Sequence, residues 1–126
     1  MSNKKRLIGL GLLDADVAVM AAGEYGVTPD HFTGVDRDIW GAILALQAER
    51  GSTDPYFVHA KLLRLGVGVT EEHIRSYEAD APRGRGAADS ACAGLIEDYI
   101  RDRGMEIGAG LTEAGPDPRG AVALAA

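Results

Sequence analysis

The sequence has 126 residues, a formal net charge of -6 and one cysteine. This length favours a single domain with one core, and the acidic balance argues against a protein that binds nucleic acid through its overall charge. One cysteine excludes an internal disulfide, and no apolar run approaches the roughly 20 residues of a membrane span. Because no secretory segment is recognisable either, we expect a cytoplasmic protein.

The first third of the chain predicts two short helices and a single turn. The helices are expected at 6–13 and 17–24, the second capped by Asp16, with Val17, Met20 and Ala21 on one face and Gly26 after its end. The following Thr-Pro pair at 28–29 is typical of a helix start. It is expected to make one turn and to bring the next aromatic residue, Phe32, into the core.

The centre of the chain predicts a longer amphipathic helix, which Asp36 would cap and Gly51 would end. The single tryptophan lies in its apolar stripe, where a core position is more common than an exposed anchor. The residues of this stripe are Ile39, Trp40, Ile43, Leu44 and Leu46.

Two further helices are expected beyond this one. Asp54-Pro55 repeats the cap-and-proline signal for a helix at 56–65, ended by Gly66. Its inward stripe would hold Val58, Leu62 and Leu65. A shorter helix would begin at Thr70, with Ile74 and Tyr77 facing inward.

The Gly/Arg segment at 83–87 predicts a hinge, followed by one long helix at 88–114 and a loose tail at 115–126. No period-2 alternation is sustained, so the sequence predicts an all-α fold. The apolar stripe of the long helix also contains Leu95 and Cys92, the latter as a small buried side chain. The other members of this stripe are Ile96, Tyr99, Ile100, Arg103, Ile107 and Leu111.

Three segments resemble the N-terminal domain of DnaB-type replicative helicases. They are LIGLGLLD at 7–14, VTPDHF at 27–32 and the stretch 32–66, which contains DIWGAILAL and later DP. The resemblance implies a compact head of about five or six short helices over residues 1–82. It also implies that the last helix corresponds to the first arm of a helical hairpin through which subunits pair, and the sequence shows no second arm.

The resemblance implies a non-catalytic domain that self-associates and docks the replicative helicase, primase or a loader protein. No Gly-x-x-x-x-Gly-Lys-Ser/Thr loop occurs in the sequence, so no triphosphate site of that kind is expected. We expect no cofactor, no metal and no direct contact with nucleic acid. The six residues from Ile96 to Leu111 named above are the candidate interface for self-association.

Two other function classes stay open. A small DNA-binding regulator or antitoxin could use residues 71–77 as a recognition helix, although this segment opens with two glutamates and offers phosphates only Arg75. A phage- or plasmid-encoded decoy of the host helicase would have the same fold as a helper. The three histidines lie in separate segments, which does not favour a metal site.

Overall fold

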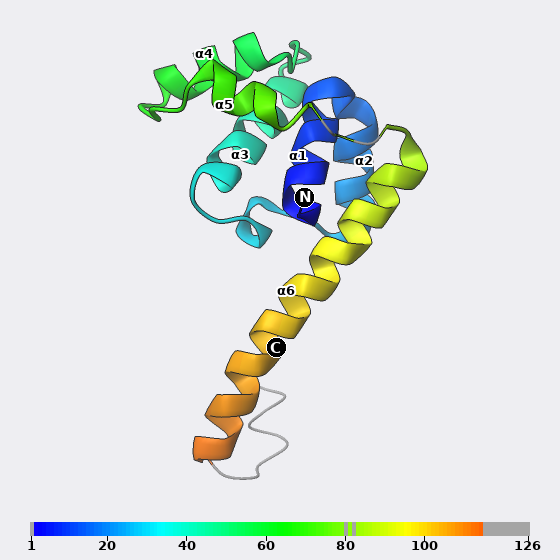
Figure 1. Ribbon diagram of the computed structural model, residues 1–126, viewed down its shortest axis with the longest axis vertical. Coiled ribbons are helices and arrows are strands. Elements are labelled where there is room, and N and C mark those ends of the chain that lie inside the picture. Colours follow the sequence, from blue (N-terminus) through cyan, green and yellow to red (C-terminus); the bar gives the residue numbers. More distant parts are fainter. Residues whose placement is uncertain (1, 80, 82, 115–126) are drawn as a thin grey trace. The chain divides into compact units, whose positions relative to one another are not determined.

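The structure is a computed structural model, and it describes residues 2–79, 81 and 83–114; the side chains of 104–114 and the tail at 115–126 lie outside the described residues. These residues form helices and no strand, which confirms the all-α prediction. The helices are α1 (Asn3–Leu13), α2 (Ala15–Tyr25), the 3-10 turn η1 (Pro29–His31), α3 (Gly34–Ala48), α4 (Pro55–Arg64), α5 (Glu71–Ser76) and α6 (Arg85–Ala114) (Figure 1).

Contacts divide the chain into two compact units, Met1–Ile96 and Glu97–Ala126. In the first unit, α1 contacts α2 and α3, α3 also contacts α4, and α4 contacts α5. From Leu7 onward helix α1 is apolar all round, which allows neighbouring helices to cover it from several sides. Leu7, Ile8, Leu10 and Leu12 are all buried there.

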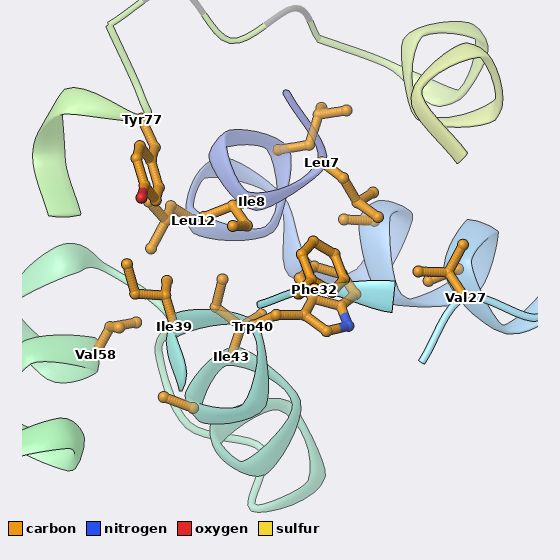
Figure 2. Packing of buried hydrophobic residues seen from close by; sticks show 14 of the residues in the cluster. Leu7, Ile8, Leu12, Val27, Phe32, Ile39, Trp40, Ile43, Val58 and Tyr77 are labelled. Carbon is orange, nitrogen blue, oxygen red and sulfur yellow. The ribbon is translucent and has the colours of Figure 1, made fainter. Parts of the chain in front are cut away.

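Trp40 and Phe32 form the centre of the core. Both are buried, and their rings stack with centroids 5.5 Å apart. Figure 2 shows the two side chains side by side among the other buried residues. Ile39 and Ile43 of α3 are fully buried beside them. The predictions that η1 is a single turn, that Phe32 enters the core and that Trp40 is a core residue are therefore confirmed.

Helix α2 begins earlier than the sequence suggested. Its cap is Asp14, whose carboxylate accepts a hydrogen bond from the Val17 amide, so the prediction that Asp16 caps this helix was wrong. Asp16 instead accepts a 2.6 Å hydrogen bond from the Gln47 amide of α3. The predicted face is correct for Ala21, which is buried, and for Val17, which packs against the core, but it was wrong for Met20, whose side chain is 57% exposed. Ala18 and Ala22 are buried beside Ala21, and these small residues let α2 lie close to its neighbours.

Helix α3 begins at Gly34 without a side-chain cap, so the prediction that Asp36 caps it was wrong. Asp36 lies in the first turn and accepts a hydrogen bond from the phenol of Tyr77, which follows α5. Burial, and then this hydrogen bond, raise the pKa of Tyr77 above its ordinary value. Ile74 and Tyr77 are both buried, as predicted.

Three helices end in the same local motif. Just past the ends of α2, α3 and α4, a backbone amide donates a hydrogen bond back to a carbonyl inside the helix, from Val27 to Ala22, Gly51 to Leu46 and Val67 to Leu62. The residue before each of these amides is left-handed, with φ of 75° at Gly26, 58° at Arg50 and 79° at Gly66. This is the Schellman motif, in which glycine is favoured at the left-handed position. The prediction that Gly51 ends α3 was wrong by one residue, because the glycine follows the left-handed position.

Arg50→Gly is therefore expected to stabilise the protein, because it removes the steric cost of a Cβ in the left-handed region. The expected gain in the free energy of unfolding is about 1 kcal/mol. Urea unfolding followed by circular dichroism measures it. Gly66→Ala is the matched control at the equivalent position of α4 and should lower stability by a similar amount. A loss of stability in Arg50→Gly would show that the Arg50 side chain contributes more than the backbone strain costs.

Candidate interaction surface

The first turns of α6 pack against the head. Helix α6 begins at Arg85, so the predicted start of this helix at residue 88 was wrong by three residues. The Arg85 guanidinium bonds to Glu24 of α2 and, at 2.9 Å, to Asp89 one turn later. Because these two carboxylates hold the Arg85 side chain in place, the helix extends into the segment for which a hinge was predicted. The buried side chains of these turns are Ala88, Ala91, Cys92 and Leu95.

Cys92 is confirmed as a small core side chain, fully buried in α6. Burial, and to a lesser extent the nearby Asp89 carboxylate, raise the pKa of the thiol to about 11. A thiol with this pKa carries almost no thiolate near neutral pH, so it is a poor nucleophile.

The predicted interface residues fall into three groups. Ile96 is partly buried and packs against the head core. Tyr99 is half-buried, Ile100 is 62% exposed, and the Arg103 guanidinium lies 5.8 Å from the centre of the Tyr99 ring. At that distance the charge and the ring attract one another. Ile107 and Leu111 lie in α6, and their side chains are outside the described residues.

Two of the three histidines form polar contacts within the head. His31 accepts a 3.0 Å hydrogen bond from the Thr28 amide through Nδ1 and so helps to cap η1. His73 lies 3.2 Å from the Tyr77 hydroxyl. Within the part of the chain that the structure describes, no three His, Cys, Asp or Glu side chains gather as metal ligands.

The segment considered as a recognition helix is short and is held against the head. Helix α5 has 6 residues, and Ile74 on its inner face is fully buried. Its one arginine, Arg75, pairs with Glu71 at 2.7 Å and with Asp54 at 3.7 Å. A guanidinium already shared between two carboxylates offers little attraction to DNA phosphates. The geometry does not favour the DNA-binding alternative.

A second exposed apolar surface, which the sequence pattern did not predict, lies on α4. Tyr56, Phe57 and Leu63 are 58%, 47% and 57% exposed. The inward stripe of α4 is correct for Val58 and Leu62 but wrong for Leu65, which is 63% exposed. Helix α4 therefore has apolar residues on two faces, of which one is packed. In the sequence, this second face is indicated by two pairs of adjacent apolar residues within the ten residues of α4, Tyr-Phe and Leu-Leu.

The sequence matches no protein-family profile and no curated protein. The structure, however, is similar to the crystal structure of the N-terminal domain of DnaB helicase from Mycobacterium tuberculosis. The TM-score is 0.78 and the sequence identity is 21%, over 98% of this chain and 90% of that one. The chain has the fold of a DnaB N-terminal domain. The predicted resemblance is thereby confirmed at the level of fold.

Within the described residues, large apolar side chains are more than half exposed on α4, at Tyr56 and Leu63, and on α6, at Ile100. No described helix is both long and apolar enough to cross a membrane.

Proposed function

We propose that this chain is a non-catalytic interaction domain that acts in DNA replication by self-association and by docking of a replicative helicase, primase or helicase loader. The observation that carries the proposal is the similarity in fold to the DnaB N-terminal domain over 98% of the chain. The absence of a Gly-x-x-x-x-Gly-Lys-Ser/Thr loop from the sequence supports a role without ATP hydrolysis.

The surface proposed for pairing is the part of α6 that follows Ile96. Ile100 is an isoleucine with well over half of its surface in water, and such side chains stabilise an assembly when a partner covers them. Tyr99 and Arg103 lie one turn apart and form a cation–π pair, which keeps the ring and the guanidinium together. Tyrosine and arginine are common energetic anchors of interfaces. Ile107 and Leu111 belong to the stripe predicted from the sequence, and they complete the proposed surface.

Ile100→Asp is expected to abolish self-association through α6, because a buried carboxylate without a partner is costly to desolvate. The weight-average mass from light scattering should fall in Ile100→Asp relative to the natural chain. Ile100 is a better choice than Ile96, whose contact with the core would mix folding with association. Glu97→Asp, an exposed change in the same helix, serves as the control. An unchanged mass in Ile100→Asp would place pairing elsewhere.

Docking is tested by mixing the chain with the replicative helicase and with the helicase-binding domain of its primase. A mixed complex by light scattering supports the replication role, and the absence of any complex contradicts it. The effect on DNA unwinding by the helicase then separates a helper from a decoy, since a decoy that enters the helicase assembly would lower the unwinding rate.

A further inference from the structure

Helix α4 has an exposed apolar face that no other described element covers. Tyr56, Ala60 and Leu63 are spaced four and three residues apart, so they form a stripe along one side of the helix. Phe57 lies beside this stripe, and its ring packs edge-on against that of Tyr56 with centroids 5.2 Å apart. The opposite face of α4 carries Val58 and Leu62, which are fully buried in the head. We call Tyr56, Phe57, Ala60 and Leu63 the α4 patch.

The charges around the α4 patch are arranged with opposite signs at its two ends. Asp54 caps the N-terminal end; its carboxylate lies 3.7 Å from the Arg75 guanidinium, and the side chain is still 51% exposed, so it can also meet a second cation. Arg64 stands exposed at the C-terminal end. Between them, the ammonium of Lys61 is already paired with Glu49 at 2.8 Å, and this pairing lowers the pKa of the Glu49 carboxyl. The rim of the patch is therefore not basic overall, and a strongly acidic partner is not indicated.

A surface with opposite charges at its two ends matches a second copy of itself when the two copies run antiparallel. In that arrangement Arg64 of each copy lies near Asp54 of the other. The macrodipoles of the two helices then also oppose each other, which is favourable. Leu63 of one copy falls on Tyr56 and Phe57 of the other. The small residue Ala60, near the middle of the stripe, allows the two helices to approach closely.

We propose that the α4 patch is a self-association surface, on which a second copy of this chain packs its own α4 in an antiparallel, two-fold arrangement. This surface is on the head, and it is distinct from the α6 face and does not depend on it. The area is small, about 100 Å² from each half-exposed aromatic ring plus Leu63, against about 800 Å² per partner in a standard interface. Pairing through the α4 patch is therefore weak, and its extent rises with protein concentration.

The test is sedimentation equilibrium of the full chain from low micromolar to near-millimolar concentration. Leu63→Asp should weaken the association at high concentration by at least about tenfold in Kd, because it puts a carboxylate where the second copy would cover the exposed leucine. Met20→Asp is the matched control, since Met20 has the same exposure, 57%, on α2 outside the patch. Circular dichroism checks that both variants are folded. Equal association in Leu63→Asp and the natural chain would overturn the proposal.

The Ile100→Asp background separates the two surfaces. If both surfaces act, each single variant has a lower mass than the natural chain, and the double variant is a monomer at all concentrations. If only Ile100→Asp lowers the mass, the α4 proposal fails and the α6 proposal stands. If only Leu63→Asp lowers the mass, the α6 proposal fails and the α4 proposal stands.

Cysteine cross-linking tests the antiparallel geometry. Ala60→Cys places a thiol near its counterpart in the second copy, so mild oxidation should give a disulfide-linked dimer. Cys92 is buried and does not interfere. Glu72→Cys, an exposed position on α5, is the control and should stay monomeric on a non-reducing gel. Equal cross-linking at the two positions would contradict the two-fold arrangement.

Discussion

Gly9→Ala is expected to destabilise the protein strongly although alanine is the better helix former. A Cβ at Gly9 would lie 2.7 Å from the Cβ of Ala81 and closer still to the carbonyl oxygen of Tyr77. One of these neighbours is backbone, so the chain after α5 would have to move away from α1. Overpacking of this kind costs about 1–3 kcal/mol or more. The helix propensity gain of about 1 kcal/mol does not offset the upper part of that range.

We therefore expect Gly9→Ala to lower the free energy of unfolding by about 2 kcal/mol, measured by urea denaturation. Gly23→Ala is the control within a helix of the same head. A Cβ at Gly23 meets nothing within 4 Å, so only the propensity term acts and stability should rise by about 1 kcal/mol. If both variants were stabilised, the segment after α5 would not be held against α1 in solution.

The sequence predicted most helices of the head because their start and stop signals are local. Asp54 and Thr70 accept hydrogen bonds from the amides of Tyr56 and His73, as such residues do at helix starts. Gly26 and Gly66 take up the left-handed conformation for which glycine is favoured. These signals depend only on neighbours within a few residues, so the sequence alone is sufficient to read them.

The predictions failed where distant parts of the chain decide between similar residues. Asp14 and Asp16 are both able to cap α2, and the bond from Gln47, 31 residues away, engages Asp16. In the same way, Asp36 is engaged by Tyr77, 41 residues away. A helical pattern likewise does not show which of two apolar faces is covered, and for that reason the α4 patch could not be predicted from the sequence.

The candidate interface on α6 could be predicted only in part. Periodicity gave a stripe along the whole helix, but the head covers its first turns and buries Cys92. The exposed part begins only beyond Ile96, which packs on the core. The boundary between the buried and the exposed part of the stripe depends on the size of the head. Tertiary packing therefore decides it, and local sequence does not. The role of the exposed part in association remains a prediction.

Trp40→Ala is expected to give the largest loss of stability among single substitutions in the core. Trp40 is fully buried, stacks on Phe32 and lies so close to α1 that a Cβ at Gly11 would be 3.1 Å from its ring. Removing the indole leaves a large cavity between α1 and α3, at a cost of about 3–5 kcal/mol. Since small domains have about 5–15 kcal/mol of stability in all, circular dichroism should show a much lower melting temperature or loss of cooperative unfolding.

Trp40→Phe separates the two parts of this effect. The indole Nε1 is buried without a hydrogen-bond partner among the described residues, and an unsatisfied donor of this kind costs about 1–3 kcal/mol. Phenylalanine removes that donor and keeps an aromatic ring against Phe32, so the loss of packing is partly offset. We expect Trp40→Phe to lose less than half as much stability as Trp40→Ala. Equal losses would mean that the indole N–H has an acceptor in solution, such as an internal water, and that Trp40 stabilises the core through a polar contact as well as through packing.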